Sequence, residues 1–256
     1  MVDGEITSWS AMFDPQYAGQ VLMINNSRDA LAAGLPQLGL TLTQKQMDTL
    51  CAFGEAVIRQ NEVMNLTAIT DPAQVAKLHL LDSLTVLTAG DLSGKRLIDV
   101  GCGAGFPGVP LAVACPALEV TLLDSLGKRV RWLEETLPTL GISARCVTAR
   151  AEEAVQSCRE QYDVATSRAV ARLSILLELT APYVRPGGRV IELQCSKHSF
   201  ALAECARALP KLGLRLEERK DFSFDGAVHT LVILKKTKPT PPQYPRRYAK
   251  IKQSPL

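Results

Sequence analysis

Four glycines follow an apolar run that contains an aspartate, and their spacing is typical of a loop that binds a nucleotide-containing cofactor. The run Leu97–Val100 leads into Gly101, and the next glycines are Gly103, Gly105 and Gly108. Glycine lets a backbone turn sharply and approach a ligand closely, because it has no side chain. The spacing from Gly103 to Gly108 also matches the dinucleotide fingerprint, so the loop alone leaves two cofactor classes open.

Residues beside these glycines favour a cationic cofactor over a pyrophosphate. Pro107 lacks an N–H donor where a following helix should begin, and a pyrophosphate would use that donor. Asp99 should bring a carboxylate to the mouth of the loop, where it would repel a phosphate and attract an ammonium or sulfonium group. Asp124 follows the glycines by about 20 residues, which suits hydrogen bonds to ribose hydroxyls. These residues favour S-adenosylmethionine, with a dinucleotide-binding domain as the alternative.

Short apolar strands alternate with helical segments from residue 96 onward, which predicts a parallel sheet covered by helices on both faces. The connection between the last two strands is too short for a crossover helix, so the last strand should pair antiparallel to its predecessor. We therefore expect a Rossmann-like α/β fold with a seven-stranded, mostly parallel sheet, and the glycine loop at the carboxyl end of its first strand. The expected strands are 96–100, 118–123, 144–148, 162–166, 189–194, 214–219 and 229–235.

An N-terminal helical extension should precede this sheet. Thr43 and Gln46 form the pattern of a capping box, and the apolar residues after them are spaced for a helix that ends near Met64. Asp71 and Pro72 then predict a second helix that runs toward residue 90. The predicted division of the chain is a helical extension, a sheet domain and a basic proline-rich tail: 1–90, 91–236 and 237–256.

The charge of the chain is unevenly distributed. The formal net charge is +3, but seven lysines and arginines and no acidic residue follow position 234. The prolines predict that this segment leaves the fold as an extended chain. A basic arm of this kind is typical of a segment that meets nucleic acid, and a merely solubilising end is the alternative.

Composition argues against several other classes of protein. Seven cysteines without a Cys-x-x-Cys pair favour reduced thiols over disulfides or a zinc site. The N-terminus lacks the basic and apolar regions of a signal peptide, and no apolar run reaches about 18 residues. We therefore expect a cytoplasmic protein without a metal or a membrane partner. We also expect a monomer, because no segment stands out as an interface.

Several separate blocks of the sequence together resemble the bacterial 16S ribosomal RNA guanine-N7 methyltransferases, also called the glucose-inhibited division protein B family. The blocks are Asn61–Thr67, His79–Ser83, Asp99–Gly108, Leu123–Arg129, Ala149–Glu152, Ser167–Ala171 and Tyr244–Pro255. Their joint occurrence is far more specific than the glycine loop alone. The resemblance implies a class I methyltransferase that uses S-adenosylmethionine to methylate N7 of a guanine in 16S ribosomal RNA, either free or within the small ribosomal subunit.

The resemblance also implies roles for individual residues. The Ala151 backbone and Glu152 would hold the adenine end of the cofactor, and Arg168 would lie near both the donor and the target. The expected cofactor-binding residues are Gly101, Gly103, Phe106, Asp124, Ala151, Glu152 and Arg168. The candidate RNA contacts are Asn65, His79, Lys128, Arg129, Lys197, Arg246 and Arg247. The sequence departs from the family pattern at Gln194 and Cys195, where many members have lysine and glycine, so Lys197 could substitute from further along.

Methylation at N7 places few demands on acid–base chemistry, because N7 carries a lone pair and loses no proton. The protein must instead align N7, the methyl carbon and the sulfur, so no catalytic acid or base is assigned. We expect His79 to be a hydrogen-bonded residue of the second helix and Trp132 to lie in the core. A methyltransferase of the same fold that acts on a small molecule or a protein is the alternative function.

Overall fold

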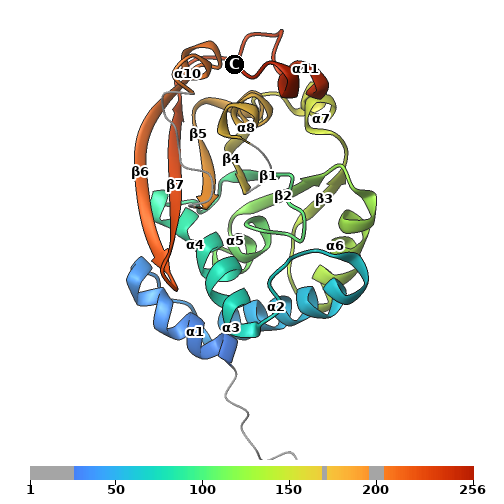
Figure 1. The fold of residues 1–256 in the computed structure, drawn as a ribbon, viewed down its shortest axis with the longest axis vertical. Helices are drawn as coiled ribbons and strands as arrows, with labels where there is room; N and C mark the ends of the chain where they lie inside the picture. The colour runs from blue at the N-terminus through green and yellow to red at the C-terminus, as the bar shows by residue number, and fades with distance from the viewer. Residues whose placement is uncertain (1–25, 169–171, 196–204) are drawn as a thin grey trace, which may run out of the picture.

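A seven-stranded sheet forms the centre of the molecule, in the order β3-β2-β1-β4-β5-β7-β6 (Figure 1). The computed structural model describes residues 26–168, 172–195 and 205–256. Strands β1 to β5 pair in parallel, and β7 runs antiparallel to both β5 and β6, as predicted. The strands are β1 (Arg96–Val100), β2 (Glu119–Asp124), β3 (Arg145–Thr148), β4 (Tyr162–Arg168), β5 (Val184–Cys195), β6 (Leu214–Phe224) and β7 (Ala227–Lys236).

Successive side chains of the central strands point into two separate apolar cores, because neighbouring residues of a strand face opposite sides of the sheet. In β1, Leu97 belongs to the core beneath the N-terminal helices, and Ile98 belongs to the core on the other face. Both side chains are buried. Burial on both faces explains why the central strands are nearly continuous apolar runs that could be predicted from the sequence.

Helices that precede β1 pack against one face of the sheet (Figure 1). The predicted capping box is confirmed, because Thr43 Oγ1 accepts from the Gln46 N–H at 3.3 Å and Gln46 Oε1 accepts from the Thr43 N–H at 2.9 Å. Asp71 caps the next helix through the Gln74 N–H at 2.8 Å. These elements are α1 (Asn26–Gly34), the tight turn η3 (Leu35–Leu38), α2 (Gln44–Met64), α3 (Pro72–Val75), the π-helical turn η4 (Ala76–Leu81), α4 (Asp82–Leu84) and the tight turn η5 (Thr85–Ala89).

The sheet is the middle of three layers. Helices α5 (Gly108–Ala114) and α6 (Gly127–Thr139) lie on the face of the N-terminal helices, and Trp132 of α6 is buried there, as predicted. Within the described ranges, none of the helices has the length and apolar character needed to span a bilayer. The opposite face carries α7 (Ala151–Cys158), α8 (Leu173–Thr180), the tight turn η6 (Ala181–Tyr183), α10 (Ala208–Lys211) and α11 (Tyr248–Gln253).

The C-terminal segment, residues 237–256, packs back over the fold, so the prediction that it leaves as an extended chain is wrong. Its helix α11 lies beside α7 and α8 (Figure 1) and buries Ile251 completely. Arg246 Nη2 donates to Glu178 Oε2 at 2.6 Å, and Glu178 is fully buried in α8. A buried carboxylate needs a charged partner, and this segment provides it. The two partners are 68 positions apart in the sequence, so the residues near either one do not predict the pair.

Candidate functional site

A cavity of about 880 Å³ opens where β1, β2 and β4 end. This is the edge at which ligands bind in open α/β sheets. We call its two ends the β2 side and the β4 side. The β2 side includes Gly101, Gly103, Asp124, Leu126, Ala151 and Glu152. The β4 side includes Leu66, His79, Phe106, Arg168, Gln194 and His229.

The glycine loop has two functions, and only its first part faces the cavity. Gly101 and Gly103 line the cavity and have φ values of 76° and 57°, which L side chains rarely adopt. At Gly108, by contrast, a Cβ atom would lie 2.3 Å from Leu122 Cδ2. The later glycine is therefore required by the packing of α5 against β2, while the first two let the backbone approach a ligand.

Asp99 does not reach the cavity, which corrects the expectation that its carboxylate lies at the mouth of the loop. Its side chain is fully buried, and Oδ2 accepts from the Gly108 N–H at 2.8 Å. Burial raises the pKa of Asp99 to about 7. Because the glycine at position 108 has no side chain, the loop closes over Asp99 and separates it from the cavity. Preference for a cationic ligand must therefore come from other groups.

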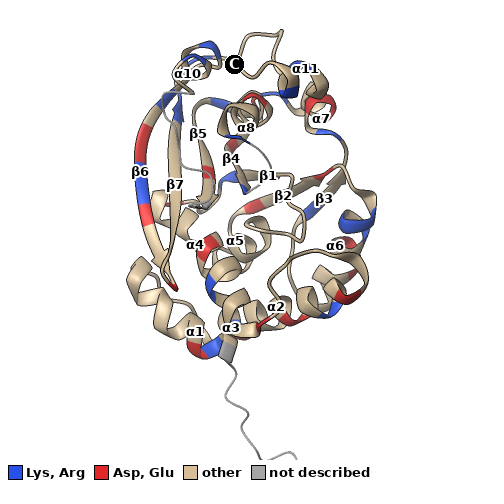
Figure 2. Ribbon diagram, viewed as in Figure 1, with Lys and Arg blue, Asp and Glu red and all other residues tan. Residues whose placement is uncertain are grey.

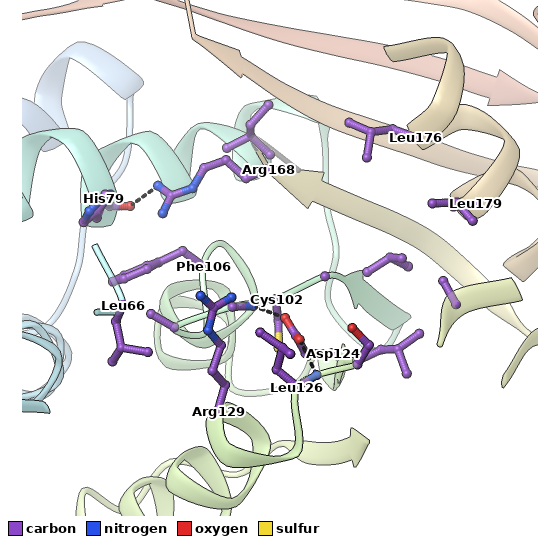
Figure 3. Close-up of a pocket in the computed structure, with 18 of the residues that line it drawn as sticks. Leu66, His79, Cys102, Phe106, Asp124, Leu126, Arg129, Arg168, Leu176 and Leu179 are labelled. Atoms are coloured by element: carbon purple, nitrogen blue, oxygen red, sulfur yellow. Dashed lines mark hydrogen bonds between the residues drawn. The ribbon is translucent and has the colours of Figure 1, made fainter. Parts of the chain in front are cut away.

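Asp124, unlike Asp99, lines the cavity. Its Oδ2 accepts from the Gly103 N–H at 2.9 Å, and its Oδ1 accepts from the Leu126 N–H at 2.8 Å (Figure 3). These two bonds join the loop after β1 to the loop after β2. A carboxylate has about four lone-pair sites, so Asp124 can hold both loops and still accept hydrogen bonds from ribose hydroxyls.

The predicted residues Ala151 and Glu152 also lie on the β2 side, at the start of α7. Arg150 Nε donates to Glu152 Oε1 at 2.7 Å, which fixes the carboxylate beside the cavity. The Ala151 carbonyl accepts from the Tyr183 hydroxyl at 2.6 Å. The wall opposite the loops is apolar, because Leu176 and Leu179 point into the cavity from α8 (Figure 3). This side combines an apolar wall with hydrogen-bonding groups at its edge, which suits a nucleoside.

Arg168 lies on the β4 side, beneath the N-terminal helices. Its Nη1 donates to Asp82 Oδ2 at 3.2 Å and to the Leu78 carbonyl at 3.3 Å. Its guanidinium lies 4.9 Å from the centre of the Phe106 ring, and both side chains are seen in Figure 3. The Leu78 carbonyl belongs to the π-helical turn η4. Such turns occur often at functional sites. Arg168 thus joins the end of β4 to the helical extension.

His79 is hydrogen-bonded, as predicted, and it also lines the cavity. Its Nε2 lies 2.7 Å from Thr67 Oγ1, and its ring stacks on Phe106 with 4.9 Å between ring centres. Burial, followed by the charge of Arg168, lowers the pKa of His79 to about 3. The imidazole is therefore neutral at physiological pH, and it adds no positive charge to the cavity.

Two further residues, His229 and Tyr248, line the cavity and were not among those predicted from the sequence. His229 begins the part of β7 that pairs with β5, and its Nδ1 lies 2.9 Å from Asp82 Oδ1. An antiparallel last strand brings its own start to the carboxyl ends of its parallel neighbours, and that rule could have found this histidine. Tyr248 lies in the segment that was expected to extend into solvent, so nothing in the sequence pointed to it.

The candidate RNA contacts divide into several groups. Arg129 lines the cavity, whereas Lys128 is exposed outside it. Asn65 caps the end of α2 with a left-handed backbone (φ 49°). Arg246 has a structural partner in Glu178, while its neighbour Arg247 is exposed. Lys197 lies outside the described residues. Across the described ranges, no group of three or more His, Cys, Asp or Glu side chains could hold a metal ion.

The family model and the related proteins that match this chain carry the same name, small subunit rRNA methyltransferase G. The family model for rRNA small subunit methyltransferase G matches residues 46–223. The ribosomal RNA small subunit methyltransferase G of Lachnoclostridium phytofermentans is 41% identical over 229 residues, which cover 87% of this chain and 95% of that protein. The protein of the same name from Thermoanaerobacter sp. is 39% identical over 240 residues, which cover 91% of this chain and 100% of that protein.

Solved structures with low sequence identity share the fold. TrmN from Thermus thermophilus aligns with a TM-score of 0.50 and 23% identity, over 61% of this chain and 48% of that chain. The YcgJ protein from Bacillus subtilis aligns with a TM-score of 0.51 and 12% identity, over 62% of this chain and 100% of that chain. The predicted class I methyltransferase fold is thereby confirmed. The matches over most of its length show that this chain belongs to the rRNA small subunit methyltransferase G family.

Proposed function

We propose that this chain transfers a methyl group from S-adenosylmethionine to N7 of a guanine in 16S ribosomal RNA. The observation that carries the proposal is a cavity with two different ends in a member of this family. The β2 side has the carboxylates and apolar wall that suit a nucleoside, and the β4 side has Phe106 and the neutral His79 for a planar base. On the same side, the Arg168 guanidinium lies 4.9 Å from the centre of the Phe106 ring.

Within this reaction the protein positions groups and does not move protons. S-adenosylmethionine supplies the methyl group when bound, and the N7 lone pair displaces it from sulfur in line. Asp124 and Glu152 would hold the nucleoside part, and the loop at Gly101 would let the backbone approach it. Because burial keeps His79 neutral, its imidazole does not repel the sulfonium charge. Alignment of reacting atoms can supply several kcal/mol, on the order of the 7–11 kcal/mol found for well-oriented intramolecular reactions.

The exposed cations of the C-terminal segment support ribosomal RNA as the substrate. Arg247, Lys250 and Lys252 are exposed on or beside α11 (Figure 2), while Tyr248 of the same helix lines the cavity. Phosphate contacts by such cations position RNA and make its binding weaker as salt increases. We propose that the enzyme acts as a monomer in the cytoplasm, which size-exclusion chromatography and cell fractionation can test.

Methylation of small ribosomal subunits tests the proposed function. Subunits from cells that lack the modification would be incubated with the protein and labelled S-adenosylmethionine, and N7-methylguanine would be mapped by chemical cleavage of the 16S RNA. We expect cleavage at a guanine that depends on both protein and methyl donor. Absence of any cleavage signal, with protein that binds the donor, would mean that the substrate has a different chemistry.

A further inference from the structure

The helix α11 and the residue before it include both buried and exposed side chains. Ile251 packs on Ile175 and Leu179 of α8, and Tyr248 packs beside them and lines the β2 side of the cavity. Arg247, Lys250 and Lys252 are exposed. The helix α11 therefore contacts both the cavity and the solvent.

Tyr248 is held in place from two directions. The Arg150 guanidinium lies 5.3 Å from the centre of its ring, and the same guanidinium is bound to Glu152 at the cavity edge. Immediately before the helix, Arg246 pairs with the buried carboxylate of Glu178. The family model ends at residue 223 and does not include this segment. A ring fixed in this way needs little ordering when a ligand arrives.

The chemistry of the β2 side indicates which part of a ligand meets this ring. Asp124 suits ribose hydroxyls, and the cavity continues beyond Asp124 to Ala151, Leu176, Leu179 and Tyr248. These groups are apolar or aromatic, so they suit a flat aromatic base better than a charged or strongly hydrated group. In S-adenosylmethionine the group attached to the ribose that has this character is adenine.

We propose that α11 is a wall of the cofactor site, with the Tyr248 ring in contact with the adenine of S-adenosylmethionine. This inference rests on the proposed function. Lys250 and Lys252 of the same helix, and Arg247 just before it, are exposed and can meet RNA phosphates. RNA that binds them holds α11 in place and thereby strengthens cofactor binding. By reciprocity, the bound cofactor raises the affinity for RNA by the same factor.

Calorimetry with S-adenosylhomocysteine, which has the same adenosine and cannot react, tests the contact. Tyr248→Ala should bind it about fivefold more weakly than wild type, the size of an aromatic contact. Tyr248→Phe keeps the ring and should bind within about twofold of wild type. Tyr244→Ala is the matched control, since Tyr244 is a partly buried residue of the same segment that does not line the cavity.

The possible results of these measurements distinguish the Tyr248 contact from general loosening of the segment and from failure of the proposed function. Wild-type affinity in Tyr248→Ala would overturn the inference, and so would an equal loss in Tyr244→Ala, which would indicate general loosening of the segment. If the wild type binds neither S-adenosylmethionine nor S-adenosylhomocysteine, the proposed function fails instead. For the coupling, saturating small subunits should raise the wild-type affinity for S-adenosylhomocysteine about fivefold or more. Lys250→Ala/Lys252→Ala should lower that gain without changing the affinity of the free protein, and an unchanged gain would overturn the coupling.

Discussion

Removing the Arg246 side chain should destabilise the fold, although this arginine is a candidate RNA contact in the sequence. Its Nε and Nη2 donate to the two carboxylate oxygens of Glu178 at 2.8 and 2.6 Å, and Glu178 is fully buried. In Arg246→Ala the Glu178 carboxylate would keep only the hydrogen bond from the backbone N–H of residue 246, which is 2.9 Å long in the wild type. Loss of one partner from a buried pair costs about 3–5 kcal/mol. Because the Arg246 side chain is 18% exposed, water can reach the pair, and we expect the lower end, about 3 kcal/mol.

Thermal unfolding measures this effect directly. For a chain of this size each kcal/mol shifts Tm by about 2–4 °C, so Arg246→Ala should lower Tm by about 6–12 °C. Arg247→Ala is the matched control, because the adjacent arginine is exposed, and its change in the free energy of unfolding should stay within about 0.5 kcal/mol. Adding Glu178→Gln to Arg246→Ala should recover part of the loss, since no charge is then buried alone. If Arg246→Ala keeps the wild-type Tm and weakens RNA binding, the structural role assigned to this ion pair is wrong.

Other perturbations test the sheet, the loop and the β4 side. Burial raises the pKa of Glu192 to about 8 from its ordinary 4.5, so the folded state keeps a proton that the unfolded state loses. The free energy of unfolding should therefore fall as pH rises from about 4.5 to 8, and Glu192→Gln should flatten that fall in urea titrations; parallel profiles for the two proteins would contradict this. Gly108→Ala would place a Cβ 2.3 Å from Leu122 Cδ2 and should lower the free energy of unfolding by about 1–3 kcal/mol, whereas wild-type stability would show that α5 can move. Arg168→Gln removes the charge over Phe106 and should reduce kcat on small subunits about a hundredfold; an unchanged kcat would exclude Arg168 from positioning the target.

The elements that could be predicted from the sequence are those whose pattern is local. The expected strand 96–100 matches β1, and the caps at Thr43 and Asp71 were found because each is indicated by a residue within three positions, Gln46 for Thr43 and Pro72 for Asp71. The position of Asp99 could not be predicted in this way. A carboxylate near the end of a strand can point into the cavity or beneath the loop, and here it is held beneath the loop by the N–H of Gly108, nine positions later.

The prediction for the C-terminal segment was wrong for a different reason. Proline and lysine predict extension because they disfavour regular structure locally. The residues that hold the segment, Arg246 and Ile251, depend on Glu178 and on the apolar surface of α8, and no local pattern records those partners. Tyr248 was missed for the same reason.

The place of β7 in the sheet has a consequence for the biosynthesis of the enzyme. In the described sheet β6 pairs with β7 alone, and β7 lies between β5 and β6 although it is made after both. At about 5–20 residues per second, β6 waits on the order of a second for its neighbour during translation. A nascent chain in which β7 and α11 have not yet been made lacks His229 and Tyr248, and with them part of the cavity. The cavity is therefore completed late in folding, when β7 enters the sheet between two strands made before it and α11 packs on α8.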